Sequence, residues 1–196
     1  MKKLCVIAAV VLVAALGIYP GAITVSAQQD AAKKTGPPKE AKSVSEVVLE
    51  SWNDIGRKLI AMAEDFPEDK YDYKPTPAQR SFAEQLLHAS GANYYFTNLA
   101  EGKPLPAAED PQRAKYKSKA DVVAFVKKSF EDGAAVIKAK GDKGMEGTVV
   151  DPYENQKVRL YEWAYGFIEH NGEHYGQLVG YYRSAGMVPP ESRPKK

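Results

Sequence analysis

Cysteine is nearly absent from this sequence of 196 residues, because the only one is Cys5. Cys5 lies at the beginning of an apolar run, whereas the modified cysteine of a lipoprotein follows such a run. Beyond this position the chain can form no disulfide and has no thiol nucleophile. Chemistry that depends on a cysteine side chain is therefore excluded for nearly the whole chain.

An excess of charge of one sign is also missing. The sequence has 27 Lys and Arg against 25 Asp and Glu. Two of the lysines, Lys2 and Lys3, lie in a stretch that we expect to be removed, so the remaining chain is balanced. A nucleic-acid-binding face needs a strong basic excess. We therefore expect no nucleic-acid partner.

Only one long apolar run occurs, at Leu4–Ile18. It follows the basic start and precedes Val25–Ala27, whose first and last residues suit signal peptidase. We expect residues 1–27 to be a signal peptide and the mature protein to be exported, either to the periplasm or outside the cell. An uncleaved membrane anchor is the alternative. However, Pro20 and the glycines on either side interrupt the run short of the ~20 apolar residues of a spanning helix, so we expect no stable membrane span after cleavage.

Helix signals begin after residues 28–42, which are small and polar and predict a flexible linker. Serines at positions 43 and 81 are each followed three residues later by Glu, which is the spacing of a capping box. Ser118 is a third candidate cap, and Gly186 is a candidate helix stop. Apolar residues of the first helix recur every three or four positions: Val48, Trp52, Ile55, Leu59, Met62 and Phe66.

These signals predict four helices, at about 43–66, 81–101, 118–140 and 156–185. Such a pattern favours an all-α fold, a four-helix bundle in one domain over residues 43–190 with a short tail at 191–196. Gly133 is expected to bend the third helix, and Thr148–Val150 to be a short extended piece. The residues expected in the core include Trp52, Ile55, Leu59, Phe82, Phe125, Trp163 and Phe167.

The three histidines of the sequence are His88, His170 and His174. His170 and His174 are four positions apart on one helix, which places their side chains on one face about 5–6 Å apart. His88 lies near the apolar side of the second helix, so all three imidazoles can converge in the core. Three neutral imidazoles suit a divalent transition metal and leave a coordination position open. The alternative is that each histidine is an ordinary hydrogen-bonded residue, because an HxxxH pair often arises by chance.

Two polar neighbours of this pair could support a metal. Glu173 could orient an imidazole or act as a base, although a solvated Glu is the simpler interpretation. Gln177 could donate to a bound water or pack between helices. The stretch His170–His174 also matches the inverted zinc-protease motif H-x-x-E-H. That motif needs a further ligand well downstream, where Glu191 is the only carboxylate side chain, so we disfavour a protease.

Two stretches resemble the DinB/YfiT-like superfamily of metalloenzymes. The first is Tyr71–Pro77, followed by Ser81–Glu84 and His88; the second is His170–Leu178, followed by Tyr182-Arg183, Gly186 and Pro189-Pro190. The resemblance covers about residues 43–190. It implies a four-helix bundle with an up-down-down-up chain path, in which His88, His170 and His174 match the metal-binding histidines of the family. Members of the superfamily bind nickel or zinc, and some transfer low-molecular-weight thiols.

From the resemblance we expect a divalent transition metal, zinc or nickel first, with iron and manganese as alternatives. The function it implies is that of a metal-dependent hydrolase or a thiol transferase acting on a small molecule that the sequence does not identify. The predicted export disfavours thiol transfer, because the thiol pool is cytoplasmic. The alternative is a non-catalytic metal-binding or dimerising envelope protein. The sequence leaves open whether the protein is a homodimer.

Overall fold

Four long helices make up most of the described residues in the computed structural model, which describes residues 39–108 and 110–194. They are α1 (Val44–Asp65), α2 (Phe82–Glu101), α3 (Lys119–Met145) and α4 (Leu160–Ser184). A small antiparallel hairpin of β1 (Thr148–Val150) and β2 (Lys157–Arg159) joins α3 to α4. The predicted signal peptide and most of the predicted linker lie outside the described residues.

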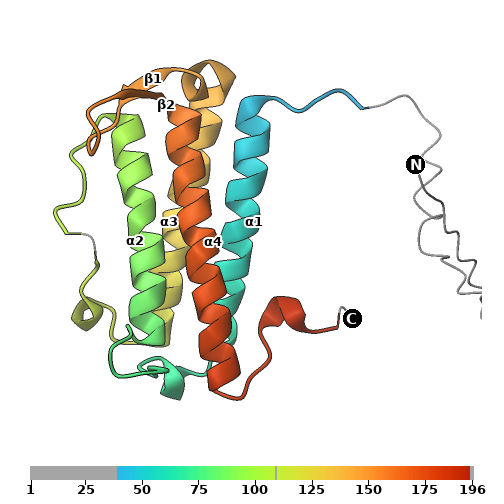
Figure 1. Ribbon diagram of the computed structural model, residues 1–196, viewed down its shortest axis with the longest axis vertical. Coiled ribbons are helices and arrows are strands. Elements are labelled where there is room, and N and C mark those ends of the chain that lie inside the picture. The colour runs from blue at the N-terminus through green and yellow to red at the C-terminus, as the bar shows by residue number, and fades with distance from the viewer. Residues whose placement is uncertain (1–38, 109, 195–196) are drawn as a thin grey trace, which may run out of the picture. The chain divides into compact units, whose positions relative to one another are not determined.

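The chain path confirms the expected up-down-down-up bundle. In Figure 1, α1 and α4 run in one direction, and α2 and α3 run in the other. Each of α1 and α2 packs mainly on α3 and α4, so α1 and α2 occupy opposite corners. The parallel arrangement of α2 and α3 requires a long crossover, residues 102–118, that returns the chain along the length of the bundle.

Three helices begin where the sequence predicts. Ser43, Ser81 and Ser118 each accept a hydrogen bond from the backbone N–H three residues later, and the acidic side chain at that position reaches back to the serine N–H. These capping boxes satisfy donors that a helix N-terminus otherwise leaves unpaired. Gly102 ends α2 in the left-handed conformation, with φ 70°.

Three predictions for α3 and α4 were wrong. α4 begins at Leu160 rather than near residue 156, because Lys157–Arg159 pairs with Thr148–Val150 as a strand. α3 continues to Met145 across a single non-helical residue, Gly141, with φ 53° and ψ −172°. Gly133 keeps a helical backbone and serves packing instead of a bend, since an added Cβ there would lie 2.0 Å from Cζ2 of Trp52.

The core contains Trp52, Ile55, Leu59 and Phe82, as expected. Phe125, Trp163 and Phe167 are only partly buried and pack at its edge, which corrects the expectation that they lie inside it. Within the described parts of the chain, none of the helices combines the length and the apolar character that crossing a membrane requires. Beyond residue 190, Arg193 binds Asp65 at 2.6 Å, which fastens the end of the described chain to α1.

Candidate metal centre

The three histidines come together between α2 and α4, which are antiparallel neighbours. His88 lies in the second turn of α2, and His170 and His174 lie one turn apart on α4. The Nε2 atoms of His170 and His174 are 3.0 Å apart. The ring centroid of His88 lies 4.7 Å from that of His174 and 5.3 Å from that of His170. One ring nitrogen from each residue lies within 4.8 Å of the other two, so the predicted convergence is present.

The surroundings of His170 and His174 favour neutral imidazoles. His88 and His174 are buried, with 5% and 6% of their surface exposed, and His170 is partly buried. Burial, with smaller contributions from the neighbouring imidazoles, lowers the pKa of His170 and of His174 to about 4. Removing an imidazole from water disfavours its charged form. At neutral pH both rings therefore keep the free lone pair that a metal needs.

An aspartate supports His88 from outside the cluster. Nδ1 of His88 donates a hydrogen bond to Oδ1 of Asp110, a residue of the crossover. The other carboxylate oxygen, Oδ2, accepts from Nη2 of Arg80 at 3.1 Å and from its Nε at 3.3 Å. Partial burial raises the pKa of Asp110, but the bonds from His88 and Arg80 outweigh it, so the pKa lies below its ordinary value. Asp110 is therefore a carboxylate at neutral pH.

His174 has an amide neighbour instead. Nε2 of Gln85, on α2, lies 2.5 Å from Nδ1 of His174 and also bonds Oε1 of Gln177. Gln177 is linked to His174 through Gln85, and a side-chain hydrogen bond with Gln177 opposes the lowering of the His174 pKa by burial. Glu173 is exposed and makes no polar contact with a histidine among the described residues. His170 differs from both other histidines, because its Nδ1 is buried with no hydrogen-bond partner in the described chain.

Sequence reasoning missed Gln85, Arg80 and Asp110. Gln85 precedes His88 by three residues and so shares its helix face, which is a signal that could have been used. Asp110 carries no such signal, because it reaches His88 from a loop with no periodic pattern.

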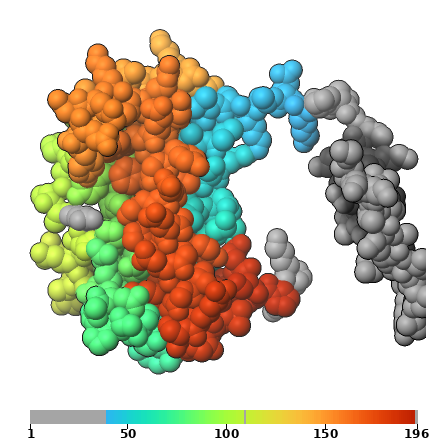
Figure 2. Space-filling model, viewed as in Figure 1, coloured from blue at the N-terminus to red at the C-terminus, as the bar shows by residue number. Residues whose placement is uncertain are grey.

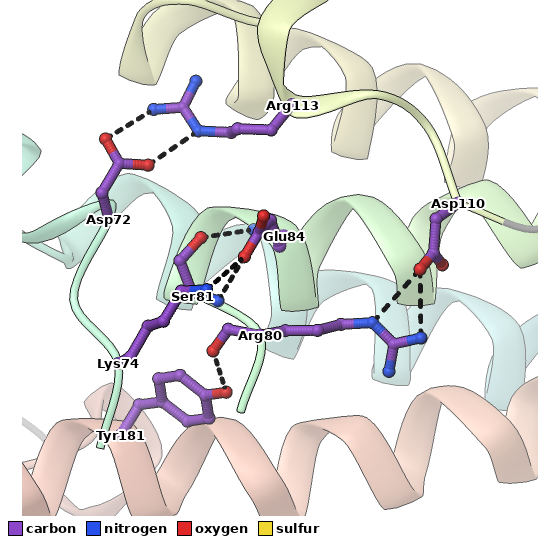
Figure 3. A network of polar contacts seen from close by, with 8 residues as sticks. All are labelled: Asp72, Lys74, Arg80, Ser81, Glu84, Asp110, Arg113 and Tyr181. Carbon is purple, nitrogen blue, oxygen red and sulfur yellow. Dashed lines mark hydrogen bonds and ion pairs between the residues drawn. The ribbon is translucent and has the colours of Figure 1, made fainter. Parts of the chain in front are cut away.

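A network of polar contacts fixes the segments around Asp110, as Figure 3 shows. The hydroxyl of Tyr181, on α4, donates to the backbone oxygen of Arg80 at 2.6 Å. Arg113 binds both carboxylate oxygens of Asp72, at 3.0 and 3.3 Å. These bonds hold the segment before α2, the crossover and α4 together beside the histidines.

A buried polar layer continues along the same helices. Nδ2 of Asn171 donates to Oδ1 of Asn93 at 2.7 Å, and Nδ2 of Asn93 donates to Oγ of Ser129 at 3.1 Å. All three side chains are fully buried. These bonds connect α2, α3 and α4, and they fix the register that places His88 opposite the α4 pair.

An aromatic row leads from the hairpin to His170. The ring of Phe167 lies 6.4 Å from that of His170 and 5.7 Å from that of Trp163, on which Tyr153 stacks at 5.9 Å. Phe167 therefore lies at the edge of the core beside His170, and Trp163 extends this edge toward the hairpin.

The donor set suits a transition metal. In tetrahedral geometry, bonds of about 2.0–2.1 Å to zinc place ligand nitrogens about 3.3–3.4 Å apart. The Nε2 atoms of His170 and His174, 3.0 Å apart, are already near this separation. Because the three ring nitrogens lie within 4.8 Å of one another, metal binding requires them to close by at most about 1.5 Å. The protease motif fits poorly, because Glu191 binds Arg57 on α1 at 2.6 Å and is engaged away from the histidines.

Comparisons with known proteins agree with this geometry. A family model described as the DinB superfamily matches residues 53–178. The structure resembles YfiT from Bacillus subtilis, described as a probable metal-dependent hydrolase with an unusual four-helix bundle topology, with a TM-score of 0.59, 13% identity, and coverage of 78% of this chain and 95% of YfiT. It also resembles the DinB-like protein YjoA from Bacillus subtilis, with a TM-score of 0.58, 20% identity, and coverage of 76% and 99%. No curated protein matches the chain significantly.

Proposed function

The chain belongs to the DinB superfamily, and from this premise we propose that it binds one divalent transition metal through His88, His170 and His174. The observation that carries the proposal is the convergence of three ring nitrogens from two helices. The low pKa values of His170 and His174 support it, because both imidazoles are neutral at physiological pH. Imidazole donors suit zinc and nickel best among the expected metals, with iron and manganese as alternatives.

We propose that the protein is a metal-dependent hydrolase of a small molecule. Among the described residues the group of candidate ligands contains three histidines and no fourth side chain, and a site with three protein ligands leaves a position for water or substrate. When bound, the metal supplies Lewis acidity for hydrolysis at neutral pH. The description of YfiT as a probable metal-dependent hydrolase is consistent with this role.

Within this proposal the residues of the chain have separate tasks. His88, His170 and His174 would hold the ion, and Asp110 and Gln85 would orient two of the rings. Thiol transfer would use the same open position and is a second outcome of the test. A non-catalytic metal-binding protein is a third.

The test is metal analysis of purified residues 28–196, with zinc affinity measured by competition with a chelator. We expect one zinc per chain in the wild type and loss of tight binding in His88→Ala, with the helical circular-dichroism spectrum unchanged. Glu173→Ala is the matched control, because this exposed side chain lies on the same helix as two of the histidines. Absence of saturable zinc binding in the wild type would reject the metal proposal. Assays of the loaded protein with ester, amide and phosphate substrates, and with thiols, then separate the three outcomes.

Export by residues 1–27 is also a proposal, supported by the basic start and the apolar run. N-terminal sequencing of protein from the cell envelope should begin at Gln28, whereas an intact Met1 in the membrane fraction would indicate an anchor. Light scattering of the purified protein tests whether it is a homodimer.

A further inference from the structure

In each of the three imidazoles, Nδ1 is the outer ring nitrogen, which faces away from the cluster, and Nε2 is the inner one. The three outer nitrogens have different partners. Nδ1 of His88 meets a carboxylate, Asp110; Nδ1 of His174 meets an amide, Gln85. Nδ1 of His170 has no partner in the described chain. Because a neutral imidazole carries one proton, the partner of the outer nitrogen decides whether the inner nitrogen is free to bind a metal.

A carboxylate only accepts hydrogen bonds, so the bond between His88 and Asp110 requires the proton to lie on Nδ1. We propose that Asp110 is a positioning residue that holds His88 in the Nδ1–H tautomer and thereby presents the lone pair of Nε2 to the cluster. The inference deepens the proposed function and rests on it where metal affinity is concerned. It also distinguishes Asp110 from Gln85, whose amide can donate or accept and so permits either tautomer of His174.

Asp110 is itself held in place from two sides. Arg80 donates twice to Oδ2, at 3.1 and 3.3 Å, which leaves Oδ1 for His88. The backbone oxygen of Arg80 in turn accepts from the hydroxyl of Tyr181, on the helix that carries His170 and His174. In Figure 3 the Arg80 side chain reaches along α4 to Asp110 on the crossover. The carboxylate is therefore fixed relative to α4, so it orients His88 toward the α4 pair.

The test is nitrogen NMR of the histidine rings in metal-free protein, where long-range couplings identify which nitrogen carries the proton. The chain has only three histidines, and single His→Gln variants assign each ring. We expect the Nδ1–H tautomer for His88 in the wild type. Asp110→Asn has the same shape but an amide that can donate, so we expect the His88 tautomer to shift toward Nε2–H. Zinc affinity should fall by about 10–100-fold, the usual range for loss of an outer partner of a ligand.

The matched control is Asp72→Asn. Asp72 is another carboxylate of the network in Figure 3 and binds Arg113, but it contacts no histidine. It should change neither the His88 tautomer nor zinc affinity.

Two results would overturn the inference: an Nε2–H tautomer of His88 in the wild type, or an Asp110→Asn variant that behaves like Asp72→Asn in both measurements. The tautomer of His88 in the wild type is measured without any variant, so it tests the inference even if Asp110→Asn folds poorly. The tautomer is read without metal, so a wild type that has the Nδ1–H tautomer but binds no zinc would count against the proposed function alone.

Discussion

The interface between α1 and α3 and the interface between α2 and α4 are built on opposite principles. At the interface between α1 and α3, an aromatic ring of each helix packs against a glycine of the other. A Cβ on Gly133 would lie 2.0 Å from Trp52, and a Cβ on Gly56 would lie 2.8 Å from Phe130. Nε1 of Trp52 donates to the backbone oxygen of Phe130 at 2.9 Å, so even the polar atom of this contact is satisfied.

Across the second interface the buried side chains are polar. Gln85, His88 and Asn93 face His174 and Asn171, and two polar atoms there, Nδ1 of His170 and Oδ1 of Asn171, have no partner among the described residues. Burying such groups without hydrogen bonds costs free energy, typically about 1–3 kcal/mol each. The difference indicates that α1 and α3 provide stability, whereas α2 and α4 tolerate a less favourable interior because it holds a site.

The largest expected effect separates the two tryptophans. Trp52→Ala should lower the free energy of unfolding by about 3–5 kcal/mol, the usual cost of truncating a buried large aromatic, because Trp52 is fully buried. Trp163→Ala should cost clearly less, because Trp163 is partly exposed and its Nε1 has no partner in the described chain. Denaturant unfolding of both variants without metal measures the difference. Equal losses of unfolding free energy would show that Trp163, at the edge of the core, contributes as much to stability as the buried Trp52.

A smaller effect should appear on acidification. The pKa of His170 and of His174 is lowered from 6.5 to about 4 by burial, so between these values the unfolded chain binds protons that the folded chain does not. Their contribution to stability is therefore complete above pH 6.5 and is lost as the pH falls toward 4. Unfolding free energies measured over this range in the presence of a chelator should decline, and a His170→Gln, His174→Gln double variant should decline less. A double variant with the same slope as the wild type would assign the acid sensitivity to other groups.

The smallest effect should come from Glu173. It lies between two histidines in the sequence but is exposed and makes no polar contact with either of them among the described residues. Glu173→Ala should therefore change the free energy of unfolding by no more than about 0.5 kcal/mol, as is usual for a surface position, and leave zinc affinity unaltered. A large loss of zinc affinity in Glu173→Ala would show that Glu173 does support the metal site. Gln85→Leu provides the comparison, because Gln85 contacts His174.

Features that depend on residues close together in the sequence were predicted correctly. The capping boxes at Ser43 and Ser81 placed helix starts correctly, and the spacing of His170 and His174 fixed their shared face. The start of α4 was misplaced because the pairing of Lys157–Arg159 with Thr148–Val150 is a contact between two strands that no helical periodicity reveals.

At the site, too, some features that depend on contacts between distant parts of the sequence could not be predicted. Helical spacing put Trp163 and Phe167 on the face of His170. Whether that face is covered depends on the hairpin, which packs Tyr153 against Trp163 and Tyr95. Asp110 could not be predicted, because only the crossover brings it to His88. The approach of His88 was predicted from its place near the apolar side of its helix, and the family resemblance implied the same three histidines.

The parallel course of α1 and α4 has a consequence for mechanics. In a bundle whose four helices simply alternate, the chain enters and leaves at the same end. Here the start of α1 and the end of α4 lie at opposite ends (Figure 1), separated by about 33 Å for a helix of 22 residues at 1.5 Å per residue. A pulling force applied through sequences fused at these two points would act along the helix axes. It would have to slide neighbouring helices past one another, breaking many side-chain contacts at once, rather than peel one helix away turn by turn.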